Sequence, residues 1–378
     1  MSAGQRSSPV DVAILLPDMR GGGAERVCLN LANNFVDRGL SVDMVVMQEA
    51  GDLLPLLDSR VNLIELGANR MVGVLLPLIR YLRQTRPSSL IANMWPLTVI
   101  SVLARTVSRC KTRLVLVEHT TLSRSESIAS PLHYSALRVS MRVLAPCADA
   151  RVTVSNGVAD DLATMTGLRR DRISTIYNPI VKSTTLKPGS TGVIGTSSIP
   201  TILNVGALKA EKDQVTLLRA FQLLVAGMEA RLVILGEGEL RGELEALAVE
   251  LGIADRVSMP GFALDPSQAY ETASLFVLSS AAEGFGNVLV EALEHGVPVV
   301  STDCPSGPRE ILEGGRYGTL VHVSDPQALA DAMRDALSRA HDSEGLKRRA
   351  QDFSVEKAAN SYLDLVLPHW RSEQVSSA

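Results

Sequence analysis

Two glutamates stand eight positions apart in the segment EGFGNVLVE, at Glu283 and Glu291. The glycines between them permit a tight turn, and an asparagine is well suited to begin a helix, so Glu291 would fall in the second helical turn. Backbone amides at such a helix start favour an anion such as a phosphate, and here they belong to Phe285, Gly286 and Asn287. Carboxylates repel phosphate but accept hydrogen bonds from hydroxyls, so the pattern predicts a site for a sugar or a ribose. An ordinary capped helix with two surface glutamates would have the same spacing.

Glycine clusters occur at two further predicted turns between a strand and a helix, at Gly22–Gly23 and at Gly236 and Gly238. Glycine lets a backbone approach a phosphate or an acceptor closely, but it also serves in simple tight turns. Neither cluster completes the dinucleotide-binding fingerprint G-x-G-x-x-G: begun at Gly21 or at Gly236, it would need its last glycine where Arg26 or Arg241 stands.

Short apolar runs alternate with amphipathic stretches along almost the whole chain. Most of these runs are near-continuous in Val, Ile and Leu, as in strands that are covered on both faces of a parallel sheet. The predicted strands are 10–17, 41–47, 61–66, 89–94, 113–118, 150–155 and 173–177, then 201–205, 230–235, 257–260, 274–279, 297–302 and 318–323. The predicted helices include 24–38, 130–144, 214–226, 240–251 and a closing helix at 355–367. This alternation predicts an α/β protein with parallel sheets.

The segment 183–200 interrupts the alternation and is rich in Ser, Thr, Gly and Pro, which predicts a linker. A chain of 378 residues also suggests two domains. We therefore expect two doubly wound Rossmann-like domains, at 1–182 and 201–378, that face each other across a cleft. Such folds bind ligands at the carboxyl ends of their strands. The closing helix could pack back on the first domain.

The net charge of the chain is small, but the charged residues are unevenly distributed along the sequence. The net charge is −4 and no Lys/Arg tract is present, which argues against a nucleic-acid binder. Residues 1–182 carry 21 Lys/Arg against 15 Asp/Glu, whereas residues 183–378 carry 16 against 26. The basic first half, with Arg80, Arg83 and Arg86 beside the apolar stretch 71–82, predicts a surface that faces an anionic membrane. Scattered, solvated arginines are the alternative.

The cysteines and the first residues bear on the compartment. Cys28, Cys110, Cys147 and Cys304 lie far apart, with no CxxC pair and no histidine at metal-ligand spacing, so we expect reduced thiols and no metal site. The first residues lack the layout of a signal peptide, and the apolar run 71–79 is too short to span a bilayer. We expect a cytoplasmic protein that associates peripherally with the inner face of the cell membrane.

The segment EGFGNVLVE resembles the E-x7-E signature of glycosyltransferase family 4, the retaining transferases of the GT-B fold. Further segments resemble the family's motifs in the same order along nearly the whole chain. RGGGAERV (20–27) is similar to its glycine-rich first loop, EHTT (118–121) to its histidine-bearing strand end, and IYNPI (176–180) to its I-x-N segment. NVGALKAEKDQVTLLRAF (204–221) is similar to its G-R-L…K motif, and LVILGEGELR (232–241) to its next strand and turn. CPSGPREIL (304–312) resembles a loop of bacterial members that assemble lipid-linked glycans or surface polysaccharides.

The resemblance implies a role for each candidate residue. Glu283 would bind hydroxyls of the donor hexose, and Glu291 would bind the nucleotide ribose. Lys212 would neutralise the donor diphosphate as it departs, and His119 would contact the donor sugar or its phosphate. The backbone at Ser306–Gly307 would complete the donor pocket.

One position departs from the family pattern. The arginine expected after Gly206 is Ala207, so one phosphate-binding cation is missing. Lys209 is the residue that could replace it.

The implied activity is transfer, with retention, of a hexose or N-acetylhexosamine from a nucleotide sugar, expected to be UDP-linked, to a lipid-diphosphate-linked or polysaccharide acceptor. The leaving diphosphate oxygen would help to deprotonate the acceptor hydroxyl on the same face of the sugar. No D-x-D triplet occurs, so we expect a metal-independent enzyme without a cofactor. Two alternatives stay open: a sugar-nucleotide epimerase or hydrolase of similar fold, and a non-catalytic nucleotide-sugar-binding module, which the missing arginine at Ala207 would suit.

Overall fold

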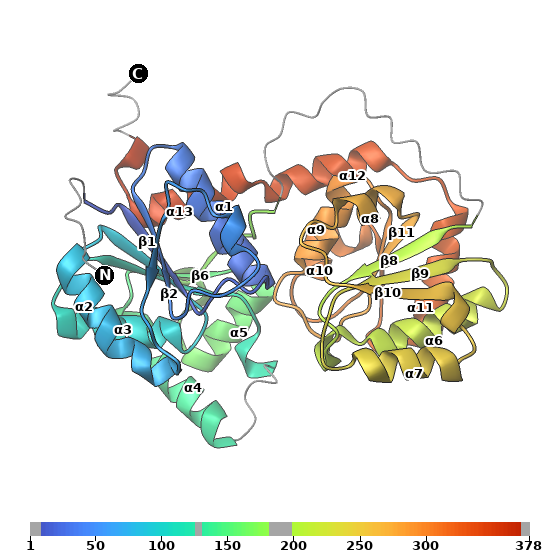
Figure 1. Cartoon of the computed structure of the whole chain (residues 1–378), viewed down its shortest axis with the longest axis horizontal. Coiled ribbons are helices and arrows are strands. Elements are labelled where there is room, and N and C mark those ends of the chain that lie inside the picture. The colour runs from blue at the N-terminus through green and yellow to red at the C-terminus, as the bar shows by residue number, and fades with distance from the viewer. Residues whose placement is uncertain (1–8, 125–130, 181–198, 372–378) are drawn as a thin grey trace. The chain divides into compact units, whose positions relative to one another are not determined.

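The computed structural model describes residues 9–124, 131–180 and 199–371. The chain divides into two compact units (Figure 1): the first comprises residues 1–179 and 355–378, and the second comprises residues 180–354. Each unit holds one parallel sheet between two layers of helices. All thirteen predicted strands are present, which confirms the α/β class and the two doubly wound domains.

The sheet of the first unit has the order β3-β2-β1-β4-β5-β6-β7, with every pair parallel. Its strands are β1 (Val12–Leu16), β2 (Val42–Val46), β3 (Asn62–Glu65), β4 (Ser89–Asn93), β5 (Arg113–Glu118), β6 (Ala150–Thr153) and β7 (Ser174–Thr175). The strand order reverses between β1 and β4, and doubly wound sheets bind ligands at the carboxyl ends of such a strand pair.

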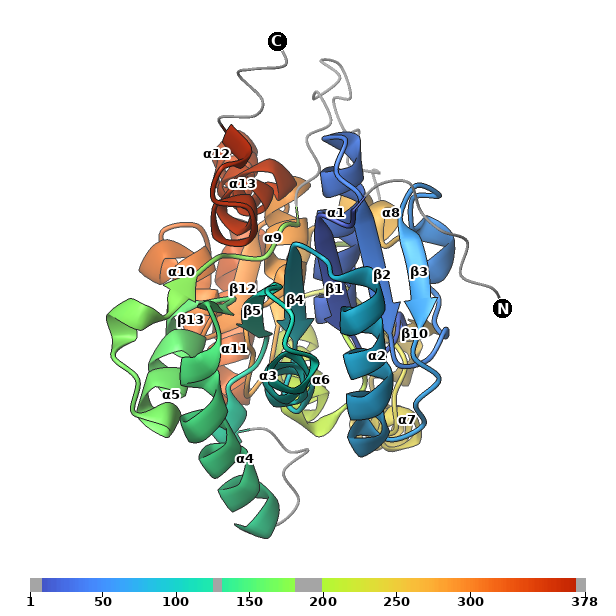
Figure 2. The same ribbon diagram turned by 90° about the vertical axis from the view of Figure 1, so that its left-hand side faces the viewer.

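Both faces of this sheet are apolar, which explains why its strands have near-continuous hydrophobic sequences. One face packs against α1 (Gly23–Asp37) and α13 (Val355–Val366). The opposite face packs against four helices (Figure 2): α2 (Leu75–Thr85), α3 (Leu97–Ser108), α4 (Pro131–Leu144) and α5 (Asn156–Thr166). Along β1 the side chains of Val12, Ile14 and Leu16 enter the first core, and those of Ala13 and Leu15 enter the second.

The closing helix α13 belongs to the first unit. Its Tyr362 and Leu363 are buried in the core that α1 also lines, and Asn360 accepts a hydrogen bond from Arg38 at 2.5 Å. The predicted second domain, 201–378, therefore extends further than the second unit, which ends at Ser354. The apolar face of α13 finds its matching surface on α1. Most of the predicted linker, 183–200, lies outside the described residues.

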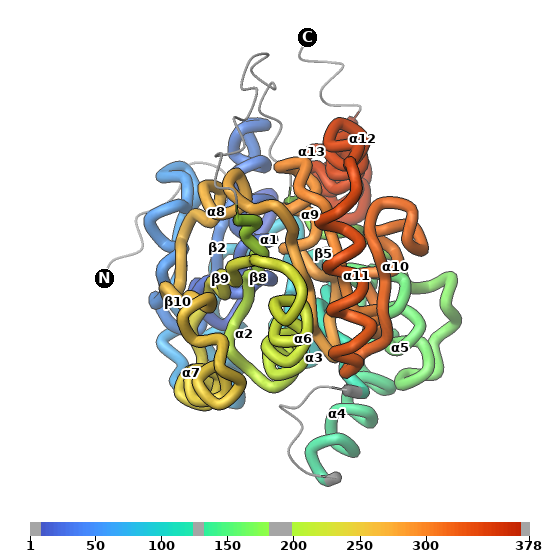
Figure 3. The backbone as a smooth tube through the Cα atoms, turned by 90° about the vertical axis from the view of Figure 1, so that its right-hand side faces the viewer, coloured from blue at the N-terminus to red at the C-terminus, as the bar shows by residue number. Residues whose placement is uncertain are grey.

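The sheet of the second unit has the order β10-β9-β8-β11-β12-β13. Its strands are β8 (Thr201–Val205), β9 (Arg231–Leu235), β10 (Val257–Gly261), β11 (Leu275–Leu278), β12 (Val299–Thr302) and β13 (Thr319–Val321). Its helices are α6 (Gln214–Val225), α7 (Arg241–Glu250), α8 (Ser267–Thr272), α9 (Asn287–Glu294), α10 (Pro308–Ile311), α11 (Pro326–Ser338) and α12 (Ser343–Ala350). Helices α6, α7 and α11 cover one face (Figure 3), and α8, α9 and α12 lie on the other. The order reverses between β8 and β11.

In the part of the chain that the structure describes, no helix combines the length and the apolar character that crossing a membrane requires.

Candidate active site

The loops that follow β8 and β11 meet where the strand order of the second unit reverses. The hydroxyl of Ser279 donates to the carbonyl of Lys212 at 2.8 Å, and the amide of Ala281 donates to the carbonyl of Glu211 at 2.9 Å. The two loops are thus hydrogen-bonded to each other directly after their strands. This fixes Lys212 and Glu283, which the two loops carry, with respect to one another.

Lys212 and Glu283 form an ion pair. The ammonium lies 2.6 Å from Oε1 of Glu283, and the hydroxyl of Ser280 donates to the same oxygen at 2.7 Å. A quarter of the Lys212 side chain and a tenth of the Glu283 side chain are exposed. Burial would lower the pKa of Lys212, but the charge and hydrogen bond of Glu283 outweigh it and raise that pKa above its usual value. The site therefore holds a permanent cation beside a carboxylate.

A third loop, which follows the neighbouring strand β12, also borders the site. The hydroxyl of Thr302 donates to the carbonyl of Ser280 at 2.6 Å. Gly307 has a φ of 82°, and a Cβ there would overlap the carbonyl oxygen of Phe285, so only glycine allows this approach. The hydroxyl of Ser306 is buried and has no hydrogen-bond partner among the described residues. Such an orphaned hydroxyl suits a bound ligand.

Cys304, in the same loop, is buried close to the ion pair. Burial and the charge of Glu283 raise the pKa of its thiol to about 12. The thiol thus stays protonated at neutral pH and is unsuited to act as a nucleophile.

Helix α9 carries the second glutamate of the motif. Gly286, with a φ of 98°, caps the helix and Asn287 begins it. The side chain of Phe285 is buried and packs edge-on against Phe353, so this residue can offer a ligand only its backbone. Oε2 of Glu291 accepts a hydrogen bond from the hydroxyl of Tyr270 at 2.8 Å.

Tyr270 is a positioning residue that the sequence reasoning missed. Its ring is buried and stacks on His295 with 5.2 Å between the centroids. The ring of His295 is held in turn against the carbonyl of Glu291, with Nδ1 at 2.8 Å. The orientation of the Glu291 carboxylate is therefore set by an aromatic pair. No spacing rule links Tyr270, on α8, to α9.

Gly236 and Gly238 pack against the loop that carries Lys212. A Cβ on Gly236 would overlap the carbonyl oxygen of Gly206, and one on Gly238 would overlap that of Leu208. Their contribution in the structure is close packing of two loops, and a contact with the donor stays a prediction. Lys209 is exposed. At residue 207, where the family pattern has an arginine, the carbonyl of Ala207 accepts a hydrogen bond from Gln214 at 3.0 Å.

In the first unit, His119 directly follows β5 and is held by Asn93 at the end of the neighbouring strand β4. Nε2 of His119 lies 2.9 Å from Oδ1 of Asn93, while the amide nitrogen of Asn93 donates to the carbonyl of Leu15 at 3.0 Å. This arrangement requires that Nε2 carries the proton and leaves Nδ1 as an acceptor. Nδ1 is buried and has no partner in the described part of the chain. Burial lowers the pKa of His119 to about 4, so the ring is neutral at pH 7.

The predicted glycines of the first loop lie at the start of α1. Gly22 caps the helix with extended backbone, Gly23 is its first residue, and both are exposed. A Cβ on Gly22 would meet only the carboxylate of Glu25, the end of a flexible side chain that can turn aside, so local packing does not require glycine there.

Comparisons with known proteins agree with this architecture. Residues 21–183 match the family model described as Glycosyltransferase Family 4, and residues 197–353 match the model Glycosyl transferases group 1. The N-acetylgalactosamine-N,N'-diacetylbacillosaminyl-diphospho-undecaprenol 4-alpha-N-acetylgalactosaminyltransferase of Campylobacter jejuni is 31% identical over 275 residues, which cover 71% of this chain and 73% of that protein. The chain belongs to glycosyltransferase family 4.

Two further similarities extend over nearly the whole glycosyltransferase. A second Campylobacter jejuni enzyme is named GalNAc-alpha-(1->4)-GalNAc-alpha-(1->3)-diNAcBac-PP-undecaprenol alpha-1,4-N-acetyl-D-galactosaminyltransferase. It is 25% identical over 372 residues, which cover 94% of this chain and 98% of that protein. The crystal structure of Anabaena HepE in complex with UDP and glucose superposes with a TM-score of 0.77 at 22% identity, covering 98% of this chain and 100% of that one. This likeness confirms the GT-B fold.

The glycosyltransferase has a buried carboxyl directly beside His119. Glu118 accepts hydrogen bonds from the hydroxyl of Thr98 at 2.9 Å and from the amide of Trp95 at 3.2 Å. Burial raises its pKa to about 7. Glu118 thus holds the loop that follows β4. Its place at the end of the apolar run 113–118 was a signal of burial, but the sequence does not show its partners.

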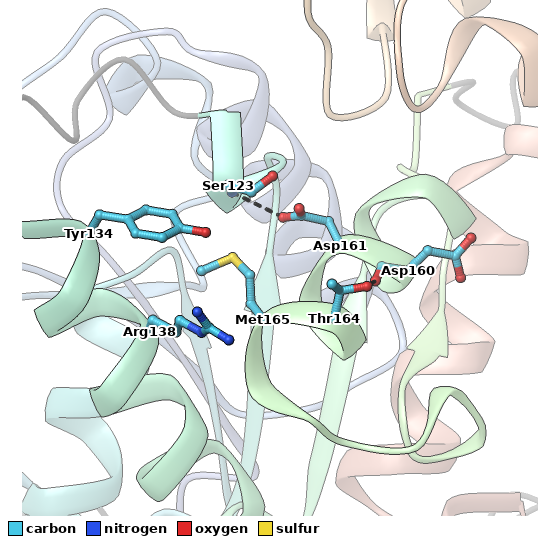
Figure 4. Close-up of a pocket in the computed structure, with 7 residues that line it drawn as sticks. All are labelled: Ser123, Tyr134, Arg138, Asp160, Asp161, Thr164 and Met165. Carbon is cyan, nitrogen blue, oxygen red and sulfur yellow. Dashed lines mark hydrogen bonds between the residues drawn. The ribbon is translucent and has the colours of Figure 1, made fainter. Parts of the chain in front are cut away.

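A hollow in the first unit contains none of the predicted site residues (Figure 4). It lies between α4, α5 and the turn that follows His119, and its volume is about 380 Å³. Asp161 accepts a hydrogen bond from the amide of Ser123 at 3.1 Å at its rim. Its lining is Ser123, Tyr134, Arg138, Asp160, Asp161, Thr164 and Met165. Because these residues are far apart in the sequence and follow no common motif, the hollow could not be predicted.

Proposed function

We propose that this glycosyltransferase moves a hexose or N-acetylhexosamine, with retention of anomeric configuration, from a UDP-sugar to a lipid-diphosphate-linked acceptor. The observation that carries the proposal is the ion pair of Lys212 and Glu283 at the reversal of the strand order, with the carboxylate of Glu291 fixed on the helix that follows. One cation and two oriented carboxylates match a ligand that has a diphosphate and two groups of hydroxyls.

Each part of this site suits one part of a nucleotide sugar. Lys212 would stabilise the negative charge that grows on the diphosphate as the sugar departs. Glu283 would accept hydrogen bonds from hydroxyls of the sugar, and Glu291 from those of the ribose. The orphaned hydroxyl of Ser306 adds a donor beside them. The UDP and glucose bound to the Anabaena protein of similar fold support UDP as the nucleotide.

The proposed mechanism uses one face of the sugar. The bond from C1 to the diphosphate oxygen breaks, the acceptor oxygen bonds to C1 on the same face, and the acceptor proton passes to the departing diphosphate. The protein then has to orient the reactants and stabilise the leaving group, and Lys212 suits the second task. The absence of a D-x-D triplet supports independence of a metal. We assign to His119, through Nδ1, a hydrogen bond from a hydroxyl of the substrates.

The lipid-linked acceptor is supported by the relatives. The names of both Campylobacter jejuni enzymes place their substrates on diphospho-undecaprenol, a lipid diphosphate. A polysaccharide without a lipid would be the competing acceptor.

The test is a donor screen followed by product analysis. Purified protein is scanned by thermal shift against UDP-, GDP- and dTDP-sugars, and the donor that binds is incubated with lipid-diphosphate-linked glycans. Mass spectrometry then identifies the product and NMR gives the configuration of the new bond. We expect a UDP-sugar to raise the melting temperature of the protein. We also expect an α-linked product from an α-linked donor without added metal. Free sugar or an epimer would favour the hydrolase or epimerase, and binding without turnover on any acceptor would favour the binding module.

A further inference from the structure

Exposed apolar side chains of the first unit gather on three neighbouring helices. Among its described residues eight large apolar side chains are exposed, and all but Leu56 lie on α2 with the turn before it, on α3 or on α4. These helices pack side by side on one face of the sheet (Figure 2). We call their outer surface the α2–α4 face, and its apolar side chains are Val72, Leu76, Leu103, Val107, Leu132, Val139 and Val143.

Helix α4 has apolar residues on two sides. Leu137 and Met141 are buried in the core below it. Leu132, Val139 and Val143 follow one another at helical spacing on the outer side and are 80%, 61% and 61% exposed. A helix that only covers a sheet needs polar residues there, so a row of exposed aliphatic side chains indicates a surface that contacts something apolar.

The charge around this face identifies the chemistry of its partner. Residues 70–147 contain eleven Lys/Arg and two Asp/Glu, and one of the two acids is the buried Glu118. Arg80, Arg138 and Arg142 are exposed and have no ion-pair partner among the described residues. Arg83 donates to the carbonyl of Val107 at 3.1 Å, which joins the outer sides of α2 and α3. Apolar rows interleaved with unpaired cations are complementary to an anionic lipid surface.

We propose that the α2–α4 face docks on an anionic bilayer, with the outer row of α4 inserted at the boundary between headgroups and acyl chains and the arginines on lipid phosphates. The inference extends the proposed function, because a lipid-linked acceptor has to be reached at a membrane surface.

Vesicle flotation tests this assignment. Wild-type protein is mixed with vesicles of phosphatidylcholine and phosphatidylglycerol, or of phosphatidylcholine alone, at low and high salt. We expect binding to the mixed vesicles at low salt, weakening as salt screens the arginines, and little binding to the neutral vesicles. Absence of binding to the mixed vesicles at low salt would overturn the proposal.

Two variants separate the apolar and the charged contribution. Leu132→Ser/Val139→Ser/Val143→Ser should weaken vesicle binding at least about tenfold, and Arg80→Gln/Arg142→Gln should weaken it by about fivefold for each arginine. The matched controls, Leu223→Ser/Val249→Ser and Arg219→Gln/Arg231→Gln, replace exposed residues of the second unit and should bind like the wild type. Wild-type affinity in the triple variant, with its melting temperature unchanged, would contradict the proposal.

Two further readouts distinguish this inference from competing results. Sedimentation velocity without lipid tests a second copy of the chain as the occupant: a dimer that only the triple variant abolishes would overturn membrane docking. Turnover is also measured with the acceptor dispersed in detergent, where the triple variant should match the wild type. Normal turnover without vesicle binding would refute the docking face alone, whereas vesicle binding without any turnover would refute only the proposed function.

Discussion

The ammonium of Lys212 lies 2.6 Å from the carboxylate of Glu283, although 71 positions separate the two residues in the chain. Each is supplied by a loop that follows one of two adjacent strands, β8 and β11, and the loops are hydrogen-bonded to each other. The pair is thus a product of the reversed strand order. Because both side chains are largely buried, removal of either one would leave the other as an unpaired charge.

This dependence predicts strong coupling between the two residues. Lys212→Gln and Glu283→Gln should each lower kcat about a hundredfold or more, since one removes a cation at the leaving group and the other an acceptor for the sugar. Each should also lower the free energy of unfolding by about 2 kcal/mol, because it leaves a partly buried charge unpaired. The double variant should lose less stability than the sum of the two. Urea unfolding and initial rates measure both effects. Glu250→Gln, at an exposed position of α7, is the control, and strictly additive effects would contradict the coupling.

A second prediction concerns the hydrogen bond between Tyr270 and Glu291. Tyr270→Phe keeps the buried ring and removes only the hydroxyl that orients the carboxylate. We expect the dissociation constant of UDP to rise about fivefold, in line with the loss of one hydrogen bond to a charged group, while kcat with saturating donor stays close to that of the wild type. Isothermal titration calorimetry with UDP gives the first value and steady-state kinetics the second. Tyr317→Phe is a matched control, and an unchanged UDP affinity in Tyr270→Phe would argue against a ribose contact at Glu291.

The third prediction concerns how the stability of the fold depends on pH, through the adjacent buried residues Glu118 and His119. The pKa of Glu118 is raised from 4.5 to about 7, so the folded protein keeps a proton that the unfolded chain loses above pH 4.5. Stability from this group is therefore full below pH 4.5 and falls by about 3 kcal/mol as the pH rises to 7. His119 acts in the opposite direction, because its pKa is lowered from 6.5 to about 4 and its stabilising effect is lost as the pH falls through that range.

Glu118→Gln isolates the carboxyl. A glutamine can accept from the Trp95 amide and donate to the Thr98 hydroxyl, as the protonated acid can, so the variant should fold. The difference between its free energy of unfolding and that of the wild type should shift in favour of the variant as the pH rises from 4.5 to 7. Urea unfolding of both proteins at several pH values measures this difference. A difference that is constant over this range would show that Glu118 does not titrate as described.

The fourth prediction concerns a variant that restores the cation which the family pattern has and this chain lacks. Ala207→Arg places a guanidinium in the loop that already carries Lys212, and we expect the affinity for UDP to rise about tenfold through a charge-assisted hydrogen bond to the diphosphate. Ala207→Gln has a long side chain without the charge and should leave the affinity near that of the wild type. Equal behaviour of the two variants would indicate that the diphosphate does not approach residue 207.

The sequence predicted the sheets well because parallel strands buried on both faces leave a strong hydrophobic pattern, and because glycines such as Gly286 and Gly307 have conformations that few other residues adopt. It singled out Lys212, Glu283 and Glu291 as candidates, whose contact with a donor stays a prediction, but it did not predict how their side chains are held. Tyr270 and Asn93 act through hydrogen bonds to residues of other segments, which only the folded chain brings together. Ser280 bonds Glu283 within one loop, but the loop conformation that allows this leaves no pattern in the sequence. For the closing helix, packing back on the first domain was one of the options, since an amphipathic helix needs an apolar partner but does not specify which one.

The place of α13 also has a consequence for biosynthesis. The second unit is a continuous stretch, residues 180–354, and the last helix of the first unit follows it in the chain. A ribosome therefore completes the second unit before it has made the helix that covers α1 and contributes Tyr362 and Leu363 to the first core. Until then the nascent first unit presents the apolar side of α1 to its surroundings, so the order of synthesis and the order of domains along the chain differ. Premature termination after residue 354 would leave a complete second unit attached to a first unit that lacks the helix covering α1.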